Sequence, residues 1–201
     1  MSLLFSPLSL GPLSLSNRIV IAPMCQYSAI DGVPQPWHVQ HIGRLAISGA
    51  GLTIIEATGV DAQGRITLED TGLWNDEQAA AFAAIIRDIR TYSDTPIGIQ
   101  LAHAGRKAST SAPWKGGGAL KAEDGAWETF SASAEPFKDD WHTPTAMTPA
   151  DMMRYADWKP TWFRSAPGCP MANTNTANNI SEPTVSMIAE NRSTTRVMPI
   201  G

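Results

Sequence analysis

The feature that most constrains the fold is an alternation of three short apolar segments with two longer amphipathic ones. Apolar runs predict strands at residues 18–22, 52–58 and 97–101. Between them, helices are predicted over residues 35–48 and from Asn75 onward, where apolar residues recur at helical spacing. Strands that alternate with helices of this length form parallel sheets covered by helices. The fold class is therefore predicted to be α/β.

Two parallel architectures fit this alternation, an open doubly wound sheet and a (β/α)8 barrel. No G-x-G-x-x-G string follows the first predicted strand, which speaks against a dinucleotide-binding open sheet and favours the barrel. A complete barrel needs about 250 residues, and the chain has 201. We therefore predict the N-terminal portion of a TIM barrel, with about three strands.

Two further segments are predicted to lie at the ends of this partial barrel. Residues 3–5 and 13–15 are apolar and separated by proline and glycine, which is compatible with a short hairpin plugging one end. Residues 103–147 show no strong periodicity and are rich in Gly, Pro, Ser and Trp. So long an irregular segment inside a compact domain is usually functional, and we interpret it as a cap over the strand ends.

The composition changes at about Tyr155. Thr148 and Pro149 form a typical helix start, but the proline-rich sequence that follows predicts that this helix does not develop. We predict a barrel domain over residues 1–154 and an irregular, disordered tail over residues 155–201, which has little apolar clustering.

Residues at the three strand ends are the candidate site. Pro23, Met24 and Cys25 follow the first strand, Ala57 lies near the end of the second, and Gln100 near the end of the third. Because the carboxyl ends of parallel strands meet at one edge, these side chains are expected to lie together. A small residue, an amide and a thiol suit the edge of an isoalloxazine ring. The alternatives are a buried structural cysteine and a glutamine that satisfies loop backbone groups.

Composition excludes several functions and partners. The net charge of −4 gives no basic surface for nucleic acid, and no apolar run approaches membrane-spanning length. Two distant cysteines and the lack of a charged leader predict a reducing, cytoplasmic location. His38 and His41 lie three residues apart, but no third ligand at matched spacing follows, so capping or solvated histidines are favoured over a metal site.

Three strings resemble the old yellow enzyme family, in particular the bacterial ene-reductases whose flavin is modulated by a cysteine. They are residues 17–27 (NRIVIAPMCQY), 64–66 (GRI) and 98–107 (GIQLAHAGRK). The motifs occur in order, and residues 144–148 (PTAMT) also fit. The resemblance covers residues 3 to about 154. It implies a TIM barrel, non-covalent FMN, reduction of the flavin by NADPH or NADH, and hydride transfer to activated alkenes such as enones.

The resemblance also implies residue roles. The flavin contacts would come from Pro23, Met24, Ala57 and Gln100, with Cys25 beside the ring adjusting its potential. Tyr27 would line the substrate side, and Cys25 and Tyr27 are the candidate catalytic residues. Ile66 would lie near the substrate. His103 and Arg106 belong to the motif, and we assign them to loop architecture.

The sequence departs from the family after this point. The His-x-x-His-x-Tyr string that grips the substrate carbonyl and supplies the proton is absent, as are the later arginine and the phosphate-binding loops. We expect a truncated chain whose tail arises from a frameshifted or misspliced reading frame. Three functions remain open: an ene-reductase of a family that is often homo-oligomeric, a non-catalytic fragment, and a flavin-free lyase or isomerase with Cys25 as nucleophile.

Overall fold

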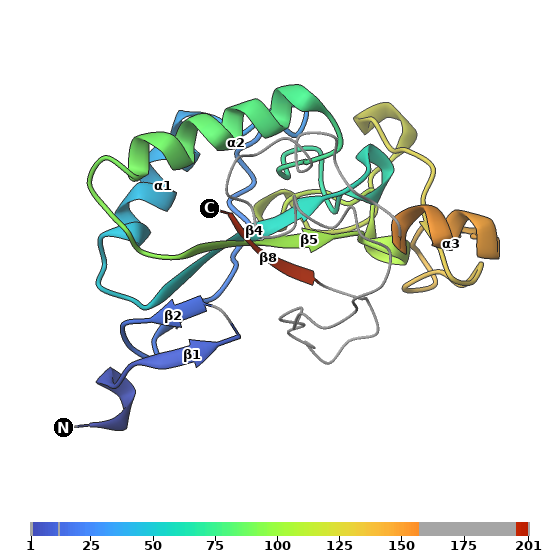
Figure 1. Ribbon diagram of the computed structural model, residues 1–201. Coiled ribbons are helices and arrows are strands. Elements are labelled where there is room, and N and C mark those ends of the chain that lie inside the picture. The colour runs from blue at the N-terminus through green and yellow to red at the C-terminus, as the bar shows by residue number, and fades with distance from the viewer. Residues whose placement is uncertain (1, 12, 157–195, 201) are drawn as a thin grey trace.

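The computed structural model describes residues 2–11, 13–156 and 196–200, and its centre is a four-stranded sheet (Figure 1). The strand order is β3-β4-β5-β8, in which the first three strands run parallel and β8 runs antiparallel to β5. The bounds of these strands are Val20–Ile21 for β3, Leu52–Gly59 for β4, Ile97–Ala102 for β5 and Arg196–Ile200 for β8.

The three parallel strands confirm the predicted order, although β3 is shorter than the predicted 18–22. β3 pairs with β4 on one side, from Val20 opposite Leu52 to Ile21 opposite Thr53. Val20 remains 39% exposed, so burial stabilises this strand less than it stabilises the neighbouring strands. Pro23 follows two residues later and has no N–H to continue the ladder.

Two helices cover one face of the sheet, and they begin where the sequence predicts. α1 spans Pro36–Ala46, and α2 spans Asp76–Ile89. Asn75 caps α2: its Oδ1 accepts the Gln78 N–H at 3.0 Å, and Gln78 Oε1 accepts the Asn75 N–H at 3.3 Å. The helices bury a continuous apolar cluster against the strands, formed by Ile42, Ala46, Ile55, Leu73, Ala79, Phe82, Ile85, Ile86, Ile89, Ile97, Ile99 and Leu101.

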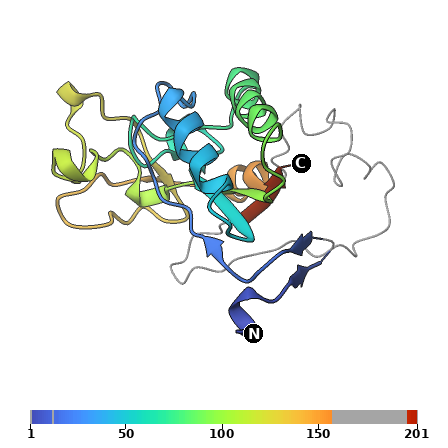
Figure 2. The same ribbon diagram turned by 90° about the vertical axis from the view of Figure 1, so that its left-hand side faces the viewer.

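A hairpin lies near the start of the strands, and its first arm differs from the prediction (Figures 1 and 2). β1 (Leu8–Leu10) pairs antiparallel with β2 (Leu13–Leu15), whereas Leu3–Phe5 form a 3-10 turn whose side chains are exposed. The alternating Leu8 and Leu10 supply the apolar face that pairing requires. Together with Leu15 they pack on Leu52 and Ile54, the side chains of β4 that face away from the helices.

The cap lies beyond the carboxyl ends of β4 and β5, on the side opposite the hairpin (Figure 1). It contains a two-residue parallel pair and short 3-10 turns. Their bounds are Phe130–Ser131 for β6, Thr145–Ala146 for β7, and Ala62–Gly64, Gly105–Lys107, Pro113–Lys115 and Ala122–Asp124 for the 3-10 turns.

One expectation about the C-terminal region was wrong. The helix that starts at Thr148 does develop, as α3 over Pro149–Ala156, because Tyr155 finds tertiary partners: its hydroxyl lies 3.1 Å from Asp61 Oδ2 and its ring packs edge-on against His103. Within the tail predicted to be irregular, residues 196–200 form β8, which pairs with β5. The remainder of that predicted tail, residues 157–195, lies outside the described residues. None of the helices in the described ranges is long and apolar enough to cross a bilayer.

Candidate functional site

Ala57 and Gln100 are half-buried positions near the ends of two strands whose residues, apart from these two and Ala102, are buried. They lie directly opposite each other in the β4–β5 ladder. Ile99 and Leu101, the neighbours of Gln100 along β5, belong to the helix-facing cluster. Because side chains alternate along a strand, Gln100 and its partner Ala57 face the other side of the sheet. The structure therefore brings these two predicted residues together on the face opposite α1 and α2.

A bulge in β4 gives Ala57 this orientation. The register runs from Ile55 opposite Ile99 to Ala57 opposite Gln100, so Glu56 is an extra residue. With regular alternation, Glu56 would share the face of Ile54, which packs toward the hairpin. Instead its carboxylate lies 3.2 Å from His38 of α1, and Ala57 takes the face opposite α1 and α2. Bulges commonly re-aim side chains in this way near functional sites.

Cys25 meets this pair from the turn that follows β3. Burial, followed by the charges of Asp70 and Glu56, raises the pKa of Cys25 to about 12. The backbone N–H of Ala57 has a smaller, opposite effect, because it favours the thiolate. Cys25 is therefore a neutral thiol at ordinary pH. In the same turn, Pro23 is half-buried and Met24 is 55% exposed. A neutral thiol that faces two carboxyl groups argues against the hypothesis of a nucleophilic, flavin-free enzyme.

Tyr27 joins this turn to the cap. Its backbone adopts φ 49°, a left-handed conformation that costs a non-glycine residue energy and often occurs at functional sites. The ring lies edge-on to Trp114 at a centroid distance of 5.1 Å. Burial, followed by the Cys25, Asp70 and Glu56 charges, raises the Tyr27 pKa above its ordinary value. Tyr27 is therefore a phenol positioned between the thiol and the cap.

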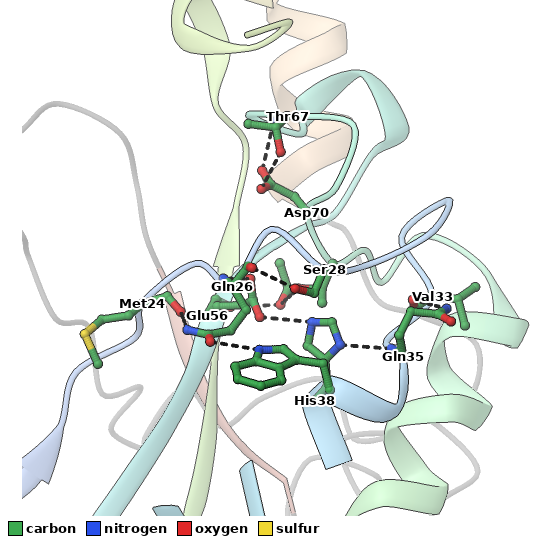
Figure 3. Close-up of polar contacts among 12 residues, drawn as sticks. Met24, Gln26, Ser28, Val33, Gln35, His38, Glu56, Thr67 and Asp70 are labelled. Atoms are coloured by element: carbon green, nitrogen blue, oxygen red, sulfur yellow. Dashed lines mark hydrogen bonds and ion pairs between the residues drawn. The ribbon is translucent and has the colours of Figure 1, made fainter. Parts of the chain in front are cut away.

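Ile66 lies in the loop after β4, and Asp70 holds that loop. Asp70 Oδ2 accepts the backbone N–H groups of Ile66 at 2.8 Å and Thr67 at 3.1 Å, while Oδ1 accepts the Thr67 hydroxyl at 2.9 Å (Figure 3). Burial raises the pKa of Asp70 to about 6, against these hydrogen bonds. After burial, the charge of Asp70 also contributes to raising the pKa values of Cys25 and Tyr27.

His103 and Arg106 serve the architecture of the cap. His103 Nδ1 accepts the Gly105 N–H at 3.1 Å. The His103 ring packs closely on Gly64, where a side chain would clash, since a Cβ at this position would lie 2.6 Å from His103 Cδ2. Arg106 donates to the Ser133 hydroxyl at 2.9 Å and lies 3.4 Å from Glu135. These contacts agree with the assignment of both residues to loop structure.

The predicted capping histidine is His38, which is fully buried. Its Nδ1 accepts the Gln35 N–H at 2.9 Å at the start of α1. Within residues 2–11, 13–156 and 196–200, no three His, Cys, Asp or Glu side chains could hold a metal ion.

Two carboxylates, Glu56 and Asp70, were not selected from the sequence as site residues. Glu56 could have been found from the sequence, because it is a charged residue inside an apolar strand and a buried carboxylate needs partners. Asp70 offered no such local signal, since it lies in a polar loop and its burial depends on the tertiary fold.

Comparison with known proteins identifies a family. Residues 3–154 match the sequence model of the family described as NADH:flavin oxidoreductase / NADH oxidase. An NADPH dehydrogenase of Bacillus licheniformis is 40% identical over 151 residues, which are 74% of this chain and 40% of that protein. An NADH:flavin oxidoreductase of Gibberella zeae is 44% identical over 124 residues, or 61% of this chain and 30% of that protein. The chain thus spans about 30–40% of the length of these relatives.

Solved structures agree in fold. Morphinone reductase superposes with a TM-score of 0.61 and 26% identity, over 76% of this chain and 41% of that chain; one of its structures is a complex with tetrahydroNAD. The old yellow enzyme from Trypanosoma cruzi has the same TM-score and identity, over 75% and 44%. These matches confirm the prediction of a partial TIM barrel.

Proposed function

This chain belongs to the NADH:flavin oxidoreductase / NADH oxidase family, and on that premise we propose that it is an FMN-binding oxidoreductase. The reductant is NADPH or NADH, and the substrate is an activated alkene such as an enone. One observation carries the proposal: Ala57 and Gln100 are paired in register on the face of the sheet opposite α1 and α2.

The residues on this face fit the ring of FMN. Ala57 leaves room for a planar group, because its side chain ends at Cβ, and Gln100 offers both a donor and an acceptor to a ring edge. Pro23 and Met24 continue this surface along the turn, with Met24 providing an exposed, polarizable contact. Cys25 presents a neutral S–H rather than a negative charge to the ring. A bound flavin would supply the hydride-transfer chemistry.

Tyr27 and Ile66 are proposed to line the substrate side. Tyr27 keeps its proton at neutral pH, because its raised pKa favours the phenol over the phenolate. It can therefore donate a hydrogen bond to a polar substrate atom. Ile66 is half-buried, and the three hydrogen bonds to Asp70 hold its loop in place. We also propose the cytoplasm as location, with a homo-oligomer as the assembled form.

A second candidate is a non-catalytic chain with the fold of the family's N-terminal part. It is favoured by the sheet, since in the described residues β3 has a ladder partner, β4, on one side. An unpaired sheet edge is a site of association between chains.

A visible spectrum of the purified chain distinguishes the two candidates. After incubation with FMN and desalting, we expect a retained flavin band, and NADPH or NADH should bleach it under anaerobic conditions. A colourless protein would reject flavin binding and favour the non-catalytic candidate. If flavin is retained, Cys25→Ala should shift its midpoint potential, whereas an unchanged potential would remove Cys25 from the ring environment. Gln40→Ala, an exposed change on α1, is the control.

A further inference from the structure

Glu56 is a buried carboxylate to which the proposed mechanism assigns no role. It is 4% exposed and occupies the bulge of β4. One oxygen, Oε2, accepts the Gln26 N–H at 2.8 Å, and the other, Oε1, lies 3.2 Å from His38 Nε2 (Figure 3). Burial of an ionised group is costly unless it is paired and hydrogen-bonded, so these contacts are needed for its stability.

The contact with His38 is an approach of 3.2 Å between Nε2 and Glu56 Oε1. His38 Nδ1 accepts the Gln35 N–H at 2.9 Å, so Nε2 is the ring nitrogen that faces Glu56. His38 thereby connects the first turn of α1 to the bulge. Burial lowers the pKa of His41, which lies one turn further along α1, and the charge of Glu56 opposes this lowering.

The contact with Gln26 fixes the turn that carries the thiol. Gln26 is flanked by Cys25 and Tyr27, and its own side chain donates to the Met24 carbonyl at 2.8 Å and accepts from Trp37 Nε1 at 3.0 Å. The main-chain N–H of Gln26 thus bonds to Glu56 of β4, and its side-chain amide bonds to Trp37 of α1. The turn is held on both sides of Cys25.

We propose that Glu56 is a positioning residue, which fixes the turn from Met24 to Tyr27 over the Ala57–Gln100 pair. The bulge that directs Glu56 toward His38 also directs Ala57 to the face opposite the helices. One local irregularity in β4 therefore positions the side chain of Ala57 and, through Glu56, the turn that carries Cys25. The role toward a flavin rests on the proposed function, whereas the effect on Cys25 can be measured without any cofactor.

Alkylation of Cys25 in the full chain tests the proposal. Rates with iodoacetamide are measured between about pH 7 and pH 10 by mass spectrometry of the peptide that contains Cys25. The groups whose charges act on this thiol are Glu56 from β4 and Asp70 from the following loop. Glu56→Gln should speed alkylation by about tenfold across this range, because a shift of one pKa unit changes the thiolate fraction tenfold.

Glu69→Gln is the matched control, since Glu69 carries a charge in the same loop as Asp70 but pairs with Lys115 at 2.6 Å. Equal alkylation profiles for the parent chain, Glu56→Gln and Glu69→Gln would overturn the proposal. Far-UV circular dichroism separates a local release from unfolding. If Glu56→Gln unfolds, Glu56→Asp decides: the shorter side chain cannot span Gln26 and His38, so faster alkylation supports the proposal and an unchanged rate rejects it.

Flavin measurements separate this inference from the proposed function. If the parent chain retains FMN, Glu56→Gln should shift the flavin midpoint potential and Glu69→Gln should not; an unchanged potential in both would contradict the positioning role toward the ring. If the parent chain retains no FMN, the proposed function fails, and the alkylation profiles still confirm or reject the control of Cys25 by Glu56.

Discussion

The two faces of the β4–β5 pair differ in what they bury. The helix-facing side is a closed apolar cluster that includes Phe82, Ile99 and Leu101. In the described residues, the opposite side packs apolar residues near the hairpin, and toward the strand ends it presents Ala57 and Gln100 half-buried. The first face supplies hydrophobic stabilisation of the fold, and the second face carries the proposed flavin site. Substitutions on the two faces should therefore separate stability from binding.

The largest effect is expected in the helix-facing cluster. Phe82 is 3% exposed, so Phe82→Ala should lower the free energy of unfolding by about 3–5 kcal/mol through lost burial and a cavity. Phe137→Ala is the matched control in the cap, where the ring is 37% exposed, and should cost clearly less. Urea unfolding followed by circular dichroism measures both. Equal losses would contradict the assignment of stability to the helix-facing side.

The next effect is a pH dependence from Asp70. Its folded pKa of about 6 lies above the ordinary 3.8, so between these values the folded chain binds more protons than the unfolded chain. The free energy of unfolding should therefore fall as pH rises through this window, by on the order of 3 kcal/mol. Asp70→Asn should flatten this dependence, whereas Asp88→Asn, at an exposed position on α2, should leave it unchanged. A parent chain without the slope would show that Asp70 titrates normally.

On the face opposite the helices, Gln100→Ala should change the affinity for FMN more than the free energy of unfolding. Loss of its hydrogen bonds should weaken FMN binding by about tenfold, near 1.4 kcal/mol. The free energy of unfolding should stay within about 0.5 kcal/mol of the parent. Fluorescence titration with FMN and urea unfolding give the two values. Unchanged affinity would remove Gln100 from the flavin site, and a large loss of stability would show that this face also supports the core.

The smallest effect is expected at the cap of α2, outside both faces. Asn75→Ala removes the acceptor for the Gln78 N–H and should cost about 1 kcal/mol. Asn75→Ser keeps an acceptor at this position and should restore most of the loss. Thermal unfolding compares the two variants. A serine variant as unstable as the alanine variant would indicate that the side chain acts through some contact other than the cap.

Much of the fold could be predicted because its signals are local. The apolar runs of β4 and β5 and the capping pair Asn75 and Gln78 depend on residues a few positions apart. The start of α3 was visible for the same reason, but its length was not, because it depends on contacts of Tyr155 with Asp61 and His103. Likewise, the hairpin was placed one arm too early, since exposure of Leu3–Phe5 is decided by what the rest of the chain can cover.

For the site, the residues that reach the strand ends could be predicted from local patterns, because parallel strands joined by helices bring Cys25, Ala57 and Gln100 to one edge. Their orientation and protonation depend on contacts between distant segments. The bulge at Glu56 is a register shift between two strands whose paired residues lie 43 or 44 positions apart in the chain, which no local pattern encodes. The raised pKa values of Cys25 and Asp70 arise mainly from burial, and burial exists only once the chain has folded.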